Sequence, residues 1–378
     1  MTPSETLKAF FQSKDIQSVL PSEPEYSTLS TFYQLQDPQR PIALVRPRNE
    51  DDVAIAVQYA TANKIKIIIR SGGGDLYGRS QAKGALSIDM REINFVAVDP
   101  GCATANVGGG CVVGDIAAQL AQHGLVTSFP PIPTVGYTGW ATLGGYGPFA
   151  PHFGLGVDQI VGARVVNGNG ELIDADQKML KGIRGGGGNL GVVVQLTIKV
   201  YPLQKILSGL IIFDSTDIAS AYPNFIKDYN KLWANGVPSE LGVQPVVFNT
   251  GDHGRQFGVI VVWSSPDMEL GQTYLDKVAA LGRETMRTVK GMTVQEWMEI
   301  NKGLVPYGVY GHDTSITVRN VTDEIAEVIG RNLAKMPSDP STQFSVHELR
   351  GPSTNSDEGS VFRARDPHYI IELLGNVM

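Results

Sequence analysis

Short apolar runs alternate with polar and amphipathic stretches through the first half of the chain. The runs over 41–46 and 67–70 predict two strands, and apolar positions recur at helical spacing over 53–60 between them. Asn49 is a candidate N-cap for this helix, and acidic residues follow it in the first turn. Strand, helix and strand in this order predict a βαβ unit.

The same pattern continues to about residue 200. Residues 1–40 are polar and weakly patterned, which predicts a short helix and an arm. We expect strands over 85–90, 95–99 and 192–200, a helix over 113–123, and a hairpin of 160–167 with 171–175. Residues 127–158 consist almost entirely of loop-forming residue types.

The pattern changes after about residue 205, where glycine becomes rarer and strand-like runs alternate with amphipathic helices. The expected strands cover 206–213, 241–248, 258–263, 315–318, 342–349 and 369–374. A further helix is expected to start at Thr322. These elements predict a second domain, an antiparallel sheet covered by helices on one side. The fold class is therefore α+β, with domains over 1–205 and 206–378.

Composition narrows the classes of function. The chain has 378 residues, of which 42% are apolar and 18% charged, and this is typical of a globular protein. A net charge of −7 argues against a nucleic-acid partner. No run is long enough for a membrane span and no signal peptide is visible, so we expect a cytoplasmic protein without a membrane partner. Cys102 and Cys111 are expected to be small buried residues, and the histidines show no metal-ligand spacing.

The first chemical motif is the glycine loop that follows the run at 67–70. It reads Arg70-Ser71-Gly72-Gly73-Gly74-Asp75 and continues through Gly78 and Arg79 to Ser80. Glycines let successive backbone N–H groups converge on an anion, so the loop predicts a phosphate site. It is neither a Walker A loop nor the dinucleotide fingerprint. The alternative is a glycine-rich turn without a ligand.

Two further glycine clusters follow along the chain. One runs from Pro133-Thr134-Val135-Gly136 to Gly147, inside the long loop, and the other covers 184–191. A loop of this length within a compact domain is uncommon unless it is functional. Its aromatic residues suit a large planar ligand.

In their order along the chain and in their residue sequence, the three clusters resemble those of the vanillyl-alcohol-oxidase flavoproteins, and most closely those of the berberine-bridge-enzyme-like branch. The resemblance covers about 41–203 and implies an FAD-binding domain of the PCMH type, built of two α/β subdomains, beside a substrate domain. It implies that the following residues bind FAD: Arg70, Ser71, Gly72, Gly73, Gly74, Asp75, Gly78, Ser80, Thr134, Val135, Gly136, Gly139, Gly144, Gly145, Tyr146, Gly147, Leu155, Asp158, Gly191 and Val192.

The resemblance also implies an activity. Members of this family oxidise alcohols, amines or activated C–H bonds by hydride transfer and then pass the electrons to oxygen. We therefore expect an FAD-dependent oxidase with two substrates, a small secondary metabolite and molecular oxygen. Val135 matches the position that gates oxygen in the family; the alternative is an ordinary loop hydrophobe.

The chain departs from the family pattern at both covalent flavin anchors. Gly74 stands where the branch commonly has a histidine, and Ile132 stands where it commonly has a cysteine. FAD is therefore expected to bind noncovalently. Relatives also continue well beyond the position of Glu372, whereas this sequence ends at Met378. A homodimer is the arrangement that would cover a flavin site left open by this difference.

Three residues are candidates for catalysis. Glu372 matches a position that often holds a catalytic residue in the branch, and we expect desolvation to raise its pKa and make it a base. Tyr310 and His312 lie with Tyr307 in an aromatic, glycine-containing stretch before a strand, where tyrosine suits substrate stacking and phenolate chemistry. The alternatives are an outward-facing glutamate and a structural histidine.

Two other classes of function stay open on the sequence. The loss of both anchors is compatible with a redox-neutral enzyme on the same fold, such as a cyclase, isomerase or pericyclase, which would work by orienting its substrate. A binding module or inactive relative is the third possibility.

Overall fold

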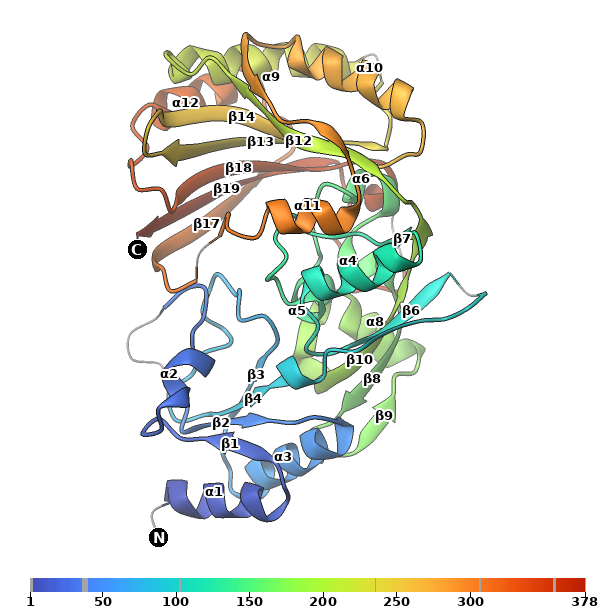
Figure 1. Ribbon diagram of the computed structural model, residues 1–378, viewed down its shortest axis with the longest axis vertical. Helices are drawn as coiled ribbons and strands as arrows, with labels where there is room; N and C mark the ends of the chain where they lie inside the picture. Colours follow the sequence, from blue (N-terminus) through green and yellow to red (C-terminus); the bar gives the residue numbers. More distant parts are fainter. Residues whose placement is uncertain are drawn as a thin grey trace.

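The fold consists of three main sheets stacked along the long axis of the molecule (Figure 1). The computed structural model describes residues 3–35, 40–101, 103–234, 236–305, 307–355 and 358–377. The amino-terminal sheet lies at one end, and the large carboxy-terminal sheet, with its helices, lies at the other. Among the described residues, none of the helices combines the length and the apolar character that crossing a bilayer requires.

The first sheet contains the expected βαβ unit. Strands β2 (Ala43–Arg46) and β3 (Ile67–Arg70) both pair in parallel with β4 (Leu86–Asp89), and α3 (Glu50–Ala62) connects β2 to β3. The side chain of Asn49 caps α3 by accepting a hydrogen bond from the Asp52 N–H (2.9 Å). The arm adds α1 (Pro3–Ser13), β1 (Gln17–Val19) and α2 (Glu25–Leu29), of which β1 pairs antiparallel with β2.

The second sheet is antiparallel and has the strand order β5-β6-β10-β8-β9. Its strands are β5 (Val96–Val98), β6 (Thr104–Gly108), β8 (Ile160–Val166), β9 (Leu172–Asp174) and β10 (Val192–Lys199). The expected hairpin is confirmed as β8 with β9, and Gly170 in its turn has a φ of 78°. The nearby helices are α4 (Val113–Gln122) and α8 (Gln177–Gly186), and a small ribbon pairs β7 (Leu125–Val126) with β11 (Tyr201–Pro202).

The long loop is more ordered than expected. It contains three short helices, α5 (Tyr137–Thr142), α6 (Ala150–Phe153) and α7 (Gly156–Gln159). The expectation of an almost continuous loop is wrong because helices of four to six residues are too short to show apolar periodicity. Local hydrogen bonds stabilise them instead; the Thr142 hydroxyl, for example, donates to the Thr138 carbonyl (2.7 Å).

The third sheet is the expected antiparallel sheet of the carboxy-terminal half, in the order β15-β12-β14-β13-β18-β19-β17 with β16 beside β12. The strands are β12 (Ile206–Phe213), β13 (Leu241–Thr250), β14 (Gly254–Trp263), β15 (Glu284–Arg287), β16 (Lys290–Met292), β17 (Tyr310–Val318), β18 (Thr342–Leu349) and β19 (His368–Val377). Helices α9 (Ile218–Ala234), α10 (Met268–Ala279) and α12 (Asp323–Leu333) cover its outer face, so the α+β architecture is confirmed (Figure 1).

Helix α11 (Val294–Ile300) lies on the opposite face of this sheet and joins it to the rest of the molecule. Trp297 and Met298 are buried in the same core as the second sheet and α4. The large sheet begins with β12 at Ile206. We therefore propose that the boundary between the two domains lies near residue 205. Cys111 is buried, as expected, whereas Cys102 lies outside the described residues.

A buried ion pair links the segment before β19 to α7. Arg365 donates two hydrogen bonds to the carboxylate of Asp158 (2.7 and 2.9 Å), and only 7% of the Arg365 side chain is exposed. Asp158 also accepts from the Leu155 N–H (2.8 Å). Because this carboxylate balances a nearly buried guanidinium, the pair holds the segment before β19 in place.

We predict that Asp158→Asn lowers the free energy of unfolding by about 3 kcal/mol, because it leaves the Arg365 charge buried without a counter-charge. Chemical denaturation measures this change. Glu299→Gln is the matched control: its pair with Lys302 is 3.7 Å long and more than two-thirds exposed, so the change should stay below about 0.5 kcal/mol. Equal effects of the two substitutions would contradict a structural role for the Asp158 pair.

Candidate cofactor and substrate site

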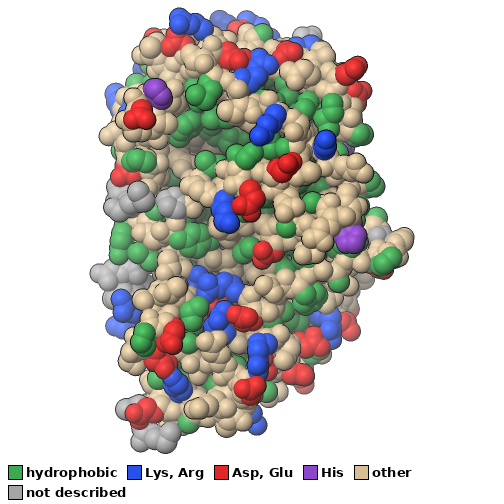
Figure 2. Space-filling model, viewed as in Figure 1, with side chains coloured by type: hydrophobic (Ala, Val, Ile, Leu, Met, Phe, Trp, Pro, Cys, Tyr) green, Lys and Arg blue, Asp and Glu red, His purple; other side chains and the backbone are tan. Residues whose placement is uncertain are grey.

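A cavity of about 1490 Å³ lies between the glycine loops and the inner face of the large sheet. Residues of 67–80, 130–146 and 186–193 line one side of it, and strands of the large sheet with α11 line the other. In Figure 2, hydrophobic side chains gather in a hollow of the molecular face at the level of the large sheet. The cavity exceeds the usual range of about 300 to 1,000 Å³ for one small ligand, so it has room for a cofactor and a substrate.

The loop after β3 forms an anion cradle on the cavity wall. Gly73 and Gly78 have φ values of 80° and 66°, which side chains rarely tolerate. Asp75 closes the loop, since its carboxylate accepts from the Arg79 side chain (2.6 and 2.8 Å). Within the described part of the chain, none of the N–H groups of 72–78 donates a hydrogen bond to another residue. These donors therefore remain available to a phosphate.

A direct contact between two glycines joins this loop to the long loop. A Cβ on Gly72 would lie 2.4 Å from the Gly136 nitrogen, and a Cβ on Gly136 would lie 2.5 Å from the Gly72 nitrogen. Neither position accommodates any larger residue without a backbone shift. The two backbones thus approach more closely than side chains would allow, and they form one continuous cavity wall.

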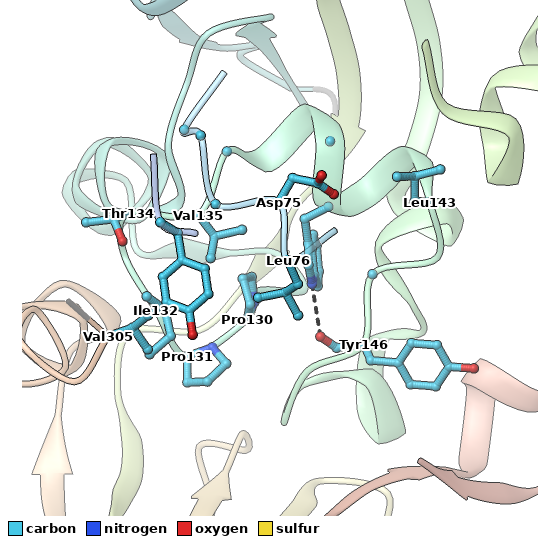
Figure 3. A pocket seen from close by; sticks show the side chains of 18 of the residues that line it. Asp75, Leu76, Pro130, Pro131, Ile132, Thr134, Val135, Leu143, Tyr146 and Val305 are labelled. Atoms are coloured by element: carbon cyan, nitrogen blue, oxygen red, sulfur yellow. Dashed lines mark hydrogen bonds between the residues drawn. The ribbon is translucent and has the colours of Figure 1, made fainter. Parts of the chain in front are cut away.

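The rest of this cavity wall combines glycines that leave open space with side chains that face the cavity. The space that a Cβ would occupy is empty at Gly139 and Gly188. In the view of Figure 3, Ile132 and Val305 lie on the left and Leu143 and Tyr146 on the right. The dashed line marks the hydrogen bond that the Trp140 indole donates to the Tyr146 carbonyl (3.0 Å) and that fixes the loop.

These features fit FAD. Free backbone N–H groups in a glycine loop suit a pyrophosphate, and the apolar wall with its empty glycine positions suits a planar ring. Ser71 and Thr138 line the cavity, and their buried hydroxyls have no hydrogen-bond partner among the described residues. Such hydroxyls are available for polar groups of a bound cofactor.

Most of the residues expected to bind FAD line the cavity. They are Ser71, Gly72, Gly73, Gly74, Asp75, Ser80, Thr134, Val135, Gly136, Gly139, Gly145, Tyr146, Gly191 and Val192. The described cavity wall does not include Arg70, Gly78, Gly144, Gly147, Leu155 or Asp158. Binding of FAD by each residue of the first group stays a prediction.

Arg70 has a structural position instead. Its guanidinium donates to the carbonyls of Leu29 and Thr31 and lies 4.5 Å from the centroid of the Phe32 ring. Burial lowers the pKa of Arg70 to about 10. The side chain therefore holds the amino-terminal arm against β3 and does not face the cavity.

The large sheet gives the cavity a roof that carries both polar and apolar side chains. Along the antiparallel register, Val246 pairs with Ser345, Ser345 with Glu372, and Glu372 with Ser315, so these side chains share one face. The polar roof residues are Gln244, Ser315, Gln343, Ser345, His347 and Glu372. The apolar roof residues are Leu210, Val246, Phe248, Ile260, Ile370 and Leu374.

Glu372 is the centre of the polar part of the roof. The Ser345 hydroxyl donates to Oε2 of Glu372 (3.0 Å), and His347 Nε2 lies 3.2 Å from the same oxygen. Burial raises the pKa of Glu372, but the hydrogen bonds from His347 and Ser345 and the nearby imidazole outweigh burial and hold that pKa below its ordinary value. The expectation of a raised pKa is therefore wrong: the cavity contains an ionised, hydrogen-bonded carboxylate.

The other two catalytic candidates do not reach the cavity. Tyr310 and His312 lie on the edge strand β17, and 53% of the Tyr310 surface is exposed. Their side chains share the face opposite to Ser315, because residues alternate along a strand. The polar alternation Gln343, Ser345, His347 within the expected strand at 342–349 was the signal that could have identified the partners of Glu372.

Tyr307, which the sequence indicated only as a tyrosine suited to substrate stacking, enters the cavity wall from the loop before β17. Its hydroxyl lies 2.9 Å from the Gly72 carbonyl and 3.2 Å from the Thr134 carbonyl, so it bridges the two glycine loops. The same hydroxyl lies 3.6 Å from the position that a Cβ on Gly74 would take. Tyr307 thus links the large sheet to the phosphate loop at the glycine that stands in the family's anchor position.

The fold and the cavity fit an enzyme that binds a dinucleotide-sized cofactor together with a substrate. Comparisons with known proteins agree. Residues 41–176 match the FAD binding domain family. The chain is 29% identical over 367 residues to the FAD-linked oxidoreductase aurO of Gibberella zeae, covering 95% of this chain and 71% of that protein.

Two further likenesses extend over nearly the whole chain. The (R)-6-hydroxynicotine oxidase of Paenarthrobacter nicotinovorans is 27% identical over 368 residues, which cover 94% of this chain and 78% of that protein. The solved structure of Physcomitrella patens BBE-like 1 superposes with a TM-score of 0.83 at 21% identity, covering 98% of this chain and 83% of that one. The chain is thus an FAD-linked oxidoreductase whose fold is that of the berberine-bridge-enzyme-like proteins, which confirms the resemblance seen in the sequence.

We predict that Tyr307→Phe raises the dissociation constant for FAD roughly fivefold, because it removes one hydrogen bond that holds the two glycine loops together. Fluorescence titration of the flavin-free protein measures this constant. Tyr310→Phe serves as the control, since that side chain is exposed outside the cavity. An unchanged FAD affinity in Tyr307→Phe would contradict the bridging role.

Proposed function

We propose that this enzyme is an oxidase that binds FAD noncovalently and removes a hydride and a proton from a small substrate held beneath the large sheet. The observation that carries the proposal is the placement of one ionised carboxylate, Glu372, in the same cavity as the glycine loops. The cofactor supplies a two-electron acceptor when bound. The chain supplies the base and the shape of the substrate space.

Noncovalent binding is supported by the residues at the two positions where the family forms its bonds to the flavin. Gly74 has no side chain, and Ile132 offers only hydrocarbon. Both residues line the cavity. Since neither can form a bond to a flavin, affinity for FAD must come from backbone donors and packing.

Glu372 is suited to accept the proton of a substrate hydroxyl or amine. Ser345 and His347 fix the carboxylate in one orientation, which is what a positioned general base needs. A pKa below the ordinary value keeps Glu372 ionised at neutral pH, so the base is ready in nearly every molecule. The His347 Nε2, 3.2 Å from Oε2 of Glu372, helps to keep the carboxylate in its proton-accepting form.

The roof favours an amphipathic substrate. Polar side chains of β18 lie beside Glu372 on β19, and hydrocarbon from Leu210, Val246 and Ile260 contributes much of the remaining roof. A ring compound with one hydroxyl or amine would place that group at Glu372 and its apolar body beneath Val246 and Leu210. We propose oxygen as the second substrate; Val135 lines the cavity with a small side chain, as the resemblance implies for an oxidase.

The direct test is a panel of aromatic alcohols and cyclic amines added to the FAD-loaded enzyme without oxygen. We expect one class to bleach the visible flavin band and, when air is admitted, to yield hydrogen peroxide. Glu372→Gln should slow bleaching by about 10² to 10⁴ while the FAD content stays unchanged. Glu327→Gln, on the exposed surface of α12, should leave the rate unaltered.

The pH profile identifies the base. With Glu372 as the base, the acid limb of the bleaching rate should lie at or below the ordinary glutamate value of about 4.3. A limb near the ordinary histidine value of about 6.5 would assign the proton to His347 instead. A bleaching rate in Glu372→Gln equal to that of the unsubstituted enzyme would refute the role of the carboxylate.

A further inference from the structure

Tyr33, on the amino-terminal arm, lies where three parts of the molecule meet. Its N–H donates to the Gly73 carbonyl of the phosphate loop (3.0 Å), and its carbonyl accepts from the N–H groups of Gly308 and Val309 (both 2.9 Å). The residue lines the cavity and is 3% exposed. Backbone hydrogen bonds among three segments distant in sequence thus fix the position of Tyr33.

The oxygen of the Tyr33 hydroxyl accepts a hydrogen bond. The side-chain amide of Asn376 on β19 donates to this oxygen (2.8 Å), and the same nitrogen donates to Oδ1 of Asp313 on β17 (2.8 Å). Asn376 is fully buried, and Asp313 is 2% exposed. Burial raises the pKa of Asp313 to about 6, so its carboxylate is mostly ionised at neutral pH. The opposite amide orientation would place the Asn376 oxygen against this carboxylate, which therefore fixes the orientation.

The arrangement leaves the phenol hydrogen without an acceptor. Across the described residues, Tyr33 donates no side-chain hydrogen bond, although its oxygen accepts one. Burial, with the charges of Asp313 and Glu372, raises the pKa of Tyr33, so the phenol keeps its proton at neutral pH. A buried donor without a partner is costly, and in a cavity wall this points to a bound ligand as the acceptor.

Tyr33 reaches the same two strands that present the base. Asp313 pairs with Leu374, and the next same-face pair along β17 and β19 is Ser315 with Glu372. Four residues of extended strand, on the order of 10 Å, separate Asn376 from Glu372. Leu374 lines the cavity between them. The roof therefore has a proton acceptor at Glu372 and a proton donor at Tyr33, with hydrocarbon between the two.

We propose that Tyr33 donates a hydrogen bond to an acceptor oxygen of the substrate and selects substrates that carry this oxygen at the far end from the group that Glu372 deprotonates. This inference rests on the proposed function and extends it. The substrate class is a fused-ring or two-ring apolar compound with a hydroxyl or amine at one end and a carbonyl, ether or hydroxyl oxygen at the other. Tyr33 is a specificity residue, and Asn376 with Asp313 positions it.

A matched pair of probes tests the proposal: a naphthylmethanol with a methoxy group on its far ring, and its analogue with a methyl group in the same place. Calorimetric titration gives the dissociation constant of each. We expect the enzyme to bind the methoxy probe about two- to tenfold more tightly than the methyl probe. Tyr33→Phe should bring this ratio to one and leave the affinity for the methyl probe unchanged.

Tyr222→Phe is the matched control, because Tyr222 is a fully buried tyrosine on α9 that does not line the cavity. The Tyr222→Phe variant should show the same ratio of probe affinities as the unsubstituted enzyme. The proposal is overturned if Tyr33→Phe keeps the ratio, if it weakens both probes equally, or if the unsubstituted enzyme binds neither probe. A loss of FAD affinity in Tyr33→Phe with an unchanged probe ratio would also overturn it, since the acceptor would then belong to the cofactor.

The readout separates this proposal from the proposed function. Calorimetry reports binding without turnover. If the ratio of the two probe affinities depends on Tyr33 but no compound of the panel bleaches the flavin, the hydrogen bond is supported and the oxidase is refuted. Conversely, bleaching by the panel together with a ratio unaffected by Tyr33→Phe would support the oxidase and refute the role of Tyr33.

Discussion

The close approach of Gly72 to Gly136 is the constraint on which the site depends. Any side chain at either position would lie within about 2.5 Å of the opposite backbone, so only glycine lets the phosphate loop and the long loop form one wall. Tyr307 then bridges the carbonyls of both loops from the other half of the molecule. The glycine contact joins the two loops, and Tyr307 connects the joined loops to the carboxy-terminal half.

The roof obtains its chemistry from strand register. Antiparallel pairing places Ser345 beside Glu372, and alternation along β18 brings His347 to the same face. Burial raises the pKa of this carboxylate, but hydrogen bonds from these two neighbours hold that pKa below its ordinary value, so the carboxylate is ionised at neutral pH. The same register places the Asn376 amide within reach of Tyr33, so one sheet fixes both a proton acceptor and a proton donor.

The sequence was most informative where local pattern decides structure. The strands at 206–213 and 342–349 were predicted with the observed bounds, since long β-branched and alternating runs identify them. The residue sequence of the glycine loops indicated an FAD site. Tyr33 was missed, and the bridging contacts of Tyr307 were not foreseen, because their partners lie hundreds of residues away, at Asn376 and Gly72. The pKa of Glu372 was predicted in the wrong direction for the same reason: its partners come from a neighbouring strand.

We propose that the glycine-lined cavity holds FAD by noncovalent contacts alone. The decisive measurement is the visible absorption spectrum of the purified protein, recorded before and after acid precipitation. The flavin spectrum should move entirely into the supernatant, because Gly74 and Ile132 can form no bond to the cofactor. Flavin that stays with the precipitated protein, or a protein that remains colourless after incubation with excess FAD, would contradict it.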